Sequence, residues 1–281
     1  MTVLPNGDLL AIWFTTVLER GREMIVAGAR LRRGAKEWDE PDLFFQVPDR
    51  NLAGQALLWD GKHTIYHFSG VGVADDWKNL SLVMRRSTDN GATWQKPEII
   101  GPEYGARHQV IDAVIKTSDG TIILLCDATP SSNGGSAVHT SKDAGDSWSD
   151  PGYGKPIPEF KEGNTGHWVA GRHAGIAELK DGSLLALGRG DSIAGKMPMS
   201  ISKDKGLTWQ YSASPFTPTK SAQRHALIRL KEGPLLLISF EQEMTDIVSN
   251  GKKSKGIGMY AALSYDEGEN MAGQKISHTR R

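Results

Sequence analysis

Ser87-Thr88-Asp89-Asn90-Gly91-Ala92-Thr93-Trp94 is one copy of a pattern, Ser-x-Asp-x-Gly-x-Ser/Thr-Trp, that recurs along the chain. Two other complete copies run from Ser141 to Trp148 and from Ser202 to Trp209, and a fourth, Ser264 to Asn270, breaks off before its tryptophan. The glycines of the four copies are 54, 61 and 62 residues apart. Such even spacing predicts a repeat architecture with one copy in each structural unit.

A second signal lies in phase with the first and consists of two-residue turns between apolar runs. The turns are Asn6-Gly7, Asp60-Gly61, Asp119-Gly120, Asp181-Gly182 and Glu232-Gly233. Asn-Gly and Asp-Gly between β-rich runs favour hairpins, because both central residues of a type I′ turn need positive φ. Each repeat is therefore predicted to hold two hairpins, the second of which ends in the octapeptide loop. Four strands per repeat without helical periodicity predict a β-propeller blade.

The octapeptide loop is expected to be structural. Its aspartate can accept hydrogen bonds from nearby backbone amides, its glycine supplies a positive φ, and its tryptophan covers the outer edge of the blade. The residues to which we assign this role are Asp89, Gly91, Trp94, Asp143, Gly145, Trp148, Asp204, Gly206, Trp209, Asp266 and Gly268.

The octapeptide resembles the Asp-box, or bacterial neuraminidase repeat (BNR), of the sialidase (neuraminidase) superfamily, and the resemblance covers essentially the whole chain. It implies an all-β, six-bladed β-propeller of sialidase type whose functional face lies where the innermost strands begin. The resemblance is less specific for activity, because Asp-boxes occur in glycosidases, lyases and binding proteins alike.

Only five hairpin units are visible in the sequence, so we expect an incomplete propeller with about five blades, formed by a single domain over residues 1–270 that is truncated at both ends. The resemblance implies an early Arg-Ile-Pro motif, which would precede Thr2. It also implies a tryptophan and a proline-containing strand after Asn270, where the chain reads Met271-Ala272-Gly273-Gln274-Lys275. A DNA stretch that encodes Met-Ala-Gly-Gln-Lys can encode Trp-Pro-Val-Lys, the expected continuation, when it is read one base later. We therefore expect residues 271–281 to be a non-native tail produced by a frameshift.

Composition excludes several classes of protein. The 281 residues include 33 basic and 33 acidic side chains, so the formal net charge of zero argues against a nucleic-acid partner. Cys126 is the single cysteine, which excludes an internal disulfide and a thiolate zinc site. Apolar runs such as 122–126 are too short for a transmembrane segment, and no cofactor motif is visible. No signal peptide is visible either, so an extracellular or periplasmic location is expected only if a leader precedes Met1.

Three innermost strands are predicted to begin with an Arg-His dipeptide. The pairs are Arg107-His108, Arg172-His173 and Arg224-His225, which lie 13, 10 and 9 residues before their hairpin glycines. Positions in phase converge in a propeller, so these cations and imidazoles would line one end of the central channel. Arginine binds a carboxylate through two parallel hydrogen bonds, and histidine suits proton transfer near neutral pH. The alternative is that the pairs cap strands or pack between blades.

The resemblance extends to single residues in the fourth blade. The segment from His173 to Arg189 matches the family layout without a gap, which places Arg189 in the carboxylate-binding arginine triad. His173 stands where the family has its general-base glutamate. A histidine can act as a base, but it does not polarise a tyrosine nucleophile as a carboxylate does.

Other family positions depart from the pattern. The first-blade loop offers Glu19 or Glu23 in place of the acid/base aspartate, and Lys253 and Lys255 lie near the third triad arginine. The blade expected to carry the tyrosine nucleophile is missing from the sequence.

Two weaker pairs complete the candidates. Asp112 and Glu241 flank inner strands and could serve as acids, although carboxylates at strand ends are more often solvated or paired. His63 and His67 could form a metal-ligand pair, although a polar sheet face is the more common explanation.

The expected partner is an acidic glycan or oligosaccharide. The leading hypothesis is an exo-glycosidase related to exo-α-sialidases, in which Arg172, Arg189 and Arg224 bind the substrate carboxylate and His173 assists proton transfer. A polysaccharide lyase acting on a uronate and a non-catalytic glycan-binding propeller are the alternatives.

Overall fold

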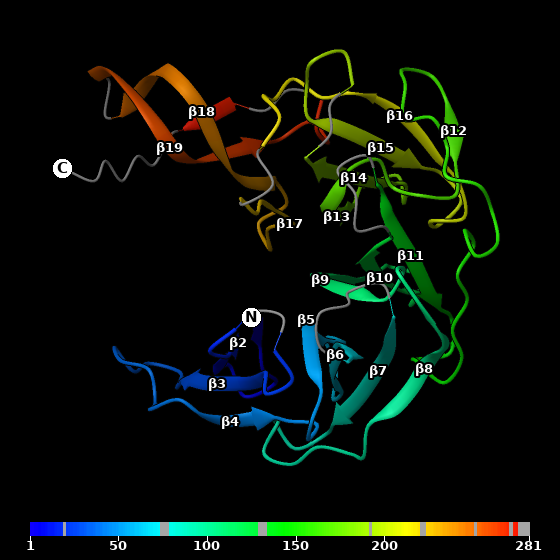
Figure 1. The fold of residues 1–281 in the computed structure, drawn as a ribbon. Coiled ribbons are helices and arrows are strands. Elements are labelled where there is room, and N and C mark those ends of the chain that lie inside the picture. Colours follow the sequence, from blue (N-terminus) through cyan, green and yellow to red (C-terminus); the bar gives the residue numbers. More distant parts are fainter. Residues whose placement is uncertain are drawn as a thin grey trace. The chain divides into compact units, whose positions relative to one another are not determined.

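The computed structural model describes residues 1–18, 21–73, 79–128, 134–190, 193–219, 223–249, 252–269 and 272–274. All regular secondary structure in these residues is β-strand, arranged in five antiparallel sheets (Figure 1). The all-β prediction and the count of about five blades are therefore confirmed for this part of the chain. It includes no helix with the length and apolarity needed to cross a lipid bilayer.

The chain divides into two compact units. The first comprises Met1–Lys116, Gly120–Pro130 and His139–Ser149, and the second comprises Thr117–Asp119, Ser131–Val138 and Asp150–Arg281. Each unit is described below by itself. The predicted single domain over residues 1–270 and the predicted tail over residues 271–281 both stay predictions, and Met271 and residues 275–281 lie outside the described part of the chain.

Each sheet begins with the strand that the sequence predicts to be innermost, and the following strands are added in chain order. The first sheet consists of β1 (Thr2–Val3), β2 (Leu9–Thr15), β3 (Ile25–Leu31) and β4 (Asp42–Phe45). The second consists of β5 (Asn51–Trp59), β6 (Ile65–Gly72), β7 (Leu80–Ser87) and β8 (Glu98–Gly105). The third consists of β9 (Gln109–Lys116), β10 (Ile122–Asp127) and β11 (Ser136–Ser141).

The remaining two sheets belong to the second unit. One consists of β13 (Arg172–Glu178), β14 (Leu184–Arg189), β15 (Pro198–Ser202) and β16 (Trp209–Ala213), with β12 (Thr165–Gly166) added beyond β16. The other consists of β17 (Ala226–Arg229), β18 (Leu235–Ser249), β19 (Lys252–Ser264) and β20 (Ala272–Gln274). This up-and-down order within each sheet is that of a propeller blade.

The predicted hairpins form, but their turns are not of type I′, because only the glycine of each dipeptide has positive φ. The glycines at the five tips have positive φ, with values of 88° at Gly7, 78° at Gly61, 92° at Gly120, 82° at Gly182 and 111° at Gly233. This backbone conformation is unfavourable for residues that have a Cβ atom. The turn glycines therefore account for the positions at which each blade reverses direction.

The Asp-box loops also form the hydrogen bonds that the sequence predicts. In the first complete loop, the Asp89 carboxylate accepts from the Thr93 backbone amide at 2.9 Å and from the Thr93 hydroxyl at 2.5 Å. The Ser87 hydroxyl donates to Asp89 and accepts from the Gly91 amide at 2.9 Å. These hydrogen bonds lower the pKa of Asp89 to about 2, the Thr93 hydroxyl contributing most. The loops at Asp143 and Asp204 repeat the pattern.

Each Asp-box loop also packs against the preceding sheet, which the sequence did not predict. A Cβ atom at Gly145 would lie 3.1 Å from Arg86 Nη2, 3.2 Å from Met84 Sδ and 3.3 Å from Tyr66 Cε1. The Tyr66 hydroxyl donates to the Ala144 carbonyl at 3.0 Å. The glycines of the other three loops make similarly close approaches to earlier strands, at Arg30, Val138 and Leu185. The Asp-box glycine thus allows two neighbouring sheets to approach each other.

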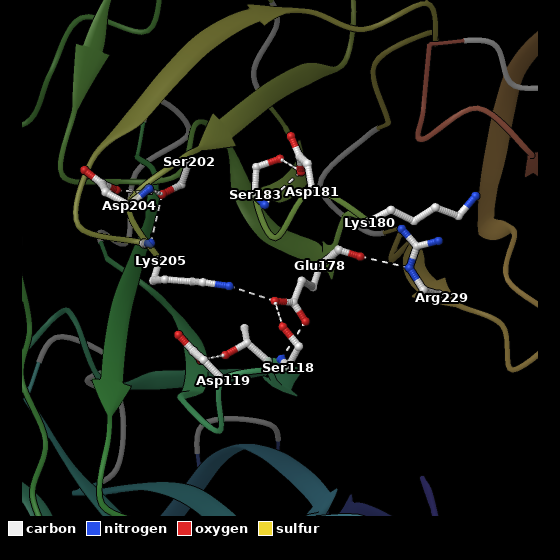
Figure 2. Close-up of polar contacts among 12 residues, drawn as sticks. Ser118, Asp119, Glu178, Lys180, Asp181, Ser183, Ser202, Asp204, Lys205 and Arg229 are labelled. Carbon is white, nitrogen blue, oxygen red and sulfur yellow. Dashed lines mark hydrogen bonds and ion pairs between the residues drawn. The ribbon is translucent and has the colours of Figure 1, made fainter.

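In the second unit, a polar network connects the Asp-box loops to hairpin tips (Figure 2). The Glu178 carboxylate accepts from the Ser118 amide at 2.7 Å, the Ser118 hydroxyl at 2.9 Å and Lys205 Nζ at 2.8 Å. Arg229 Nε donates to the Glu178 carbonyl at 2.9 Å, and Arg229 Nη2 pairs with Glu267 at 2.5 Å. These contacts hold the hairpin ends of the blades together at the end remote from the starts of the inner strands.

The apolar core lies between adjacent sheets. In the first unit, Leu4 and Leu10 pack against Leu57 and Ile65 of the next blade. A second cluster in the second unit joins residues of β14 and β15 to β17, β18 and β19. Each of these clusters lies between the facing surfaces of two neighbouring sheets.

We predict that Gly145→Ala is more destabilising than Gly120→Ala. Both glycines have a φ of 92°, so both substitutions incur the penalty for a left-handed alanine, about 1–2 kcal/mol. Only the methyl group at position 145 would collide with Arg86, Met84 and Tyr66, since no atom lies within 4 Å of a Cβ at Gly120. Urea unfolding of the two variants measures the difference, and equal losses would show that the Asp-box glycine has no packing role.

Candidate functional site

The candidate site of the second unit is built on β13 and β14. Arg172 and Arg189 face each other in this pair, but the register shifts before Gly175 pairs with Leu187. The shift is a β-bulge, and it places His173 in the left-handed region with a φ of 46°. Bulges redirect side chains out of the regular alternation of a strand. His173 therefore does not occupy an ordinary strand position.

His173 lies in a cluster of positive charge. Its side chain is buried, with 9% of the residue exposed. Burial, followed by the nearby charges of Arg189, Arg224 and Arg172, lowers the pKa of His173 to about 2. The imidazole is consequently neutral at physiological pH, and three guanidinium groups act on one small volume.

The three guanidinium groups are not equivalent. Arg189 is 7% exposed, and its Nη1 donates to the Gln223 carbonyl at 2.6 Å. Arg172 lies beside Gly190, where a Cβ atom would be 3.3 Å from Arg172 Nη2, and Arg224 is exposed. Among the described residues, no acidic side chain forms an ion pair with Arg172 or Arg224. This arrangement can accept an anion at Arg172 and Arg224, and the buried Arg189 adds positive charge at the same histidine.

His225 lies next to this cluster and contacts the preceding sheet. His225 Nε2 lies 2.6 Å from the Leu187 carbonyl oxygen and 3.3 Å from the Gly175 backbone nitrogen. Burial and the charge of Arg189 lower the pKa of His225 to about 4, although the bond to Leu187 acts in the opposite direction. The sequence predicted a substrate-binding role for His225, and the structure adds a packing role between two blades.

The pair Arg107-His108 belongs to the first unit and is arranged differently. His108 Nδ1 is 2.7 Å from the Leu80 carbonyl, and the imidazole lies against Gly101, both of the preceding sheet. The Arg107 carbonyl accepts from His139 Nε2 at 2.9 Å. The left-handed bulge residue of this inner strand is Asp112, four residues after His108, whereas in β13 it is His173 itself. The bulge therefore falls at a different distance from the Arg-His pair in β9 and in β13, and convergence of the three pairs stays a prediction.

Comparison with known proteins places the chain in a family. The model of the BNR repeat-like domain matches residues 7–270. The chain belongs to the BNR repeat-like domain family. A sialidase from Bacteroides fragilis (strain YCH46) is 31% identical over 136 residues, which are 46% of this chain and 22% of that protein. The match thus spans about a fifth of the length of the curated relative.

Solved structures share the fold of this BNR repeat-like protein. The intramolecular trans-sialidase from Ruminococcus gnavus has a TM-score of 0.66 at 15% identity, covering 97% of this chain and 82% of that one. The NanB sialidase from Streptococcus pneumoniae has a TM-score of 0.66 at 13% identity, covering 96% and 59%. A Dyadobacter fermentans protein of unknown function has a TM-score of 0.63 at 16% identity, covering 98% and 80%. The fold is therefore a sialidase-type β-propeller.

The remaining candidates of this BNR repeat-like chain are spread over both units. Glu19 lies outside the described residues. Glu23 is exposed and forms an isolated backbone bridge with Arg50. Lys253 and Lys255 lie on β19, where their backbones pair with Val248 and Asp246 of β18. Assignment of these residues to a catalytic or binding role stays a prediction.

His67 belongs to a buried polar network that the sequence did not predict. His67 Nε2 is 2.7 Å from Gln55 Oε1, and Arg85 Nε donates to His67 Nδ1 at 2.9 Å. The Arg85 guanidinium lies 4.4–4.8 Å from the ring centroids of Phe44, Phe45 and Trp94. Burial lowers the pKa of Arg85 to about 10 and holds the pKa of His67 well below its usual value.

The possible metal-ligand pair of His63 and His67 does not form a site. Both ring nitrogens of His67 are occupied, so it is not available for a metal. His63 lies in an exposed turn. No group of three or more metal-ligating side chains occurs in the described part of the chain.

We predict that His173→Asn makes stability less dependent on pH. Below the unfolded-state pKa of 6.5, the unfolded chain binds a proton at His173 that the folded chain, with a pKa of about 2, does not bind. Stability is therefore lost as the pH falls, by about 2 kcal/mol for this residue between pH 7.5 and pH 5. Asparagine tolerates the left-handed conformation and does not titrate. Urea unfolding across this pH range should show the smaller loss in the variant, and identical losses would contradict a neutral buried His173.

Proposed function

We propose that this protein binds an acidic glycan through a carboxylate held by Arg172 and Arg224, and that it is an exo-glycosidase of sialidase type. The observation that supports this most directly is the arginine cluster around the neutral His173. A carboxylate would pair with guanidinium groups through charge-assisted, two-point hydrogen bonds. Arg189, fixed by Gln223, would add charge behind the ligand without having to move.

The comparison proteins support the same class of ligand. The curated relative is named as a sialidase, and the Ruminococcus gnavus structure is described as a complex with oseltamivir carboxylate. These statements concern those proteins. In this chain, the free energy cost of gathering three guanidinium groups gives an independent reason to expect an anion, because an anionic ligand would reduce their mutual repulsion.

The proposed reaction is hydrolysis of a terminal glycosidic bond. Water would supply the hydroxyl group to the released acidic sugar and a proton to the leaving alcohol. With a pKa of about 2, His173 is a weak base in the unliganded protein. A bound carboxylate would offset the arginine charges and raise the pKa of His173 towards its usual value, so proton transfer would depend on ligand binding.

Two alternatives remain open. A lyase would use a histidine to remove the proton next to a uronate carboxylate, and a binding protein would use the arginines alone. The low pKa of His173 bears on both enzymes alike, because the carboxylate of a bound uronate would raise it as that of a sialic acid would. The arginine cluster is compatible with the binding protein. The product of the reaction separates the three possibilities.

We predict that the protein binds 3′-sialyllactose and does not bind lactose, measured by isothermal titration calorimetry. Arg172→Met should weaken binding of 3′-sialyllactose about 10- to 100-fold, as expected for loss of a charged hydrogen-bond donor. Lys203→Met is the matched control, since Lys203 is an exposed cation beyond the far end of β15, the end at which Ser202 pairs with Leu184. It should leave the affinity unchanged.

The same samples test the reaction. Release of free sialic acid supports the hydrolase. A rise in ultraviolet absorbance from an unsaturated uronate, after incubation with a uronate oligosaccharide, would identify a lyase instead. Binding of 3′-sialyllactose without either product would leave a binding protein. Equal affinity for 3′-sialyllactose and lactose would overturn carboxylate recognition altogether.

A further inference from the structure

In two of the complete Asp-boxes, the tryptophan is held by the glycine of its own loop. Trp148 Nε1 donates to the Gly145 carbonyl at 3.0 Å, and Trp209 Nε1 donates to the Gly206 carbonyl at 3.2 Å. Trp209 is fully buried, and the Trp148 ring meets the Phe68 ring of the preceding sheet edge to face, with 5.5 Å between the centroids. The loop thus combines a carbonyl acceptor for the indole N–H with an apolar surface for the ring.

The fourth Asp-box loop keeps the same backbone. Ser264 Oγ donates to the Asp266 carboxylate at 2.9 Å and accepts from the Gly268 amide at 2.8 Å. Glu267 and Gly268 have φ values of 62° and 94°, against 59° and 89° at the corresponding positions of the third complete loop. The Gly268 carbonyl therefore belongs to the residue that accepts the indole N–H in the two loops above.

This loop differs from the others in having no tryptophan. The tryptophan of each complete copy stands three residues after the glycine, and Met271 takes that position here, outside the described residues. Methionine has neither an aromatic ring nor an N–H donor in its side chain. Tyr265 is the one aromatic residue between Ser264 and Asn270, and it is 70% exposed. The fourth copy consequently has the loop that holds an indole, but no indole of its own.

A pocket of about 620 Å³ lies beside this loop, entirely within the second unit. Tyr265 to Glu269 form one side, and β14, β15 and the hairpin tip after β13 form the other. Lys180, Asp181 and Ser183, which Figure 2 labels, belong to its polar edge. Its apolar lining consists of Leu179, Leu185, Met199 and Ile201. The volume is within the range of small-molecule pockets, about 300–1,000 Å³.

The apolar lining is part of the packed structure of the unit. Met199 and Ile201 are half-buried and alternate along β15 with buried residues, so both lie on the same face of the strand. Together with Leu179 they pack against the core cluster of β14, β17, β18 and β19. A Cβ atom at Gly268 would lie 3.0 Å from Leu185 Cδ2, so the loop and this wall are close to each other. Covering half-buried apolar side chains with a ring is favourable in water.

We propose that this pocket binds an indole-containing small molecule, whose ring packs against Leu185, Met199 and Ile201 and whose N–H donates to the Gly268 carbonyl. The support is internal to the chain, because the same loop holds an indole in the same way at Trp148 and Trp209. The inference does not rest on the proposed function, since the pocket shares no residue with the arginine cluster.

The first test is calorimetry with indole as the probe. Indole should bind saturably at one site per chain. Benzofuran has the same shape with an oxygen in place of the N–H, so it leaves the Gly268 carbonyl without a donor and should bind about 3- to 10-fold more weakly. Absence of saturable indole binding overturns the inference, and equal affinity for the two compounds overturns the assignment of Gly268.

A matched pair of variants tests the wall of the pocket. Ile201→Gln places an amide where the ring would pack and should weaken indole binding about 10-fold or more. Leu207→Gln makes a similar change in the third complete Asp-box loop, at a residue that is 45% exposed and does not line the pocket, and should leave indole binding unchanged. Urea unfolding of both variants checks that they are folded.

Met271→Trp restores the tryptophan of the fourth Asp-box. The new indole should occupy the pocket from within the chain, raise the urea midpoint and abolish binding of added indole. This variant also decides the matter if Ile201→Gln does not fold, because filling the pocket stabilises the protein. Indole binding that is unchanged in Met271→Trp would place the compound elsewhere and overturn the inference.

Discussion

The hydrogen-bonded Asp-box loop is the constraint on which the blades depend. Its aspartate closes the loop by accepting a hydrogen bond from the residue four positions later, as Asp89 does from Thr93. The closed loop places its glycine, which has no side chain, at the point of closest approach to the preceding sheet. The sheets can then bury their apolar faces against each other. The loops lie at the hairpin end of the blades, so they secure one end of each inner strand and leave the other end available for irregular backbone.

Two half-buried arginines, Arg85 and Arg172, have different surroundings. Arg85 is enclosed by three aromatic rings, donates to His67 and to the Phe44 carbonyl, and so has favourable partners for its charge in the folded protein. Arg172 has no acidic partner among the described residues and, like Arg189 and Arg224, acts on the buried His173 through its charge. Burying charge without compensation is costly. The second arrangement is therefore one that a ligand can improve.

The sequence predicts most of the fold, because its signals are local. A positive φ at Gly120 follows from the Asp-Gly dipeptide, and the bonds within the Asp-box follow from residues no more than four positions apart.

The site is less predictable. The bulges at Asp112 and His173 depend on how β9 and β13 pair with their neighbours, and neither residue has a local pattern that marks it. Counting back from the hairpin glycines aligns Arg107 with Arg172, but the left-handed bulge residue is Asp112 in β9 and His173 in β13. The His67 network was missed for a related reason, since Gln55 and Arg85 reach His67 from the strands on either side.

The same bulge couples strain, charge and chemistry at His173. The left-handed backbone removes His173 from the regular alternation of the strand, and burial and three arginines suppress its protonation. An anion that pairs with Arg172 and Arg224 would lessen the electrostatic part of that suppression and leave the part that burial causes. Binding and basicity are then linked: the imidazole becomes a better base only when the ligand is present. In the proposed site, the proton affinity of the imidazole would therefore rise with the charge of the bound ligand.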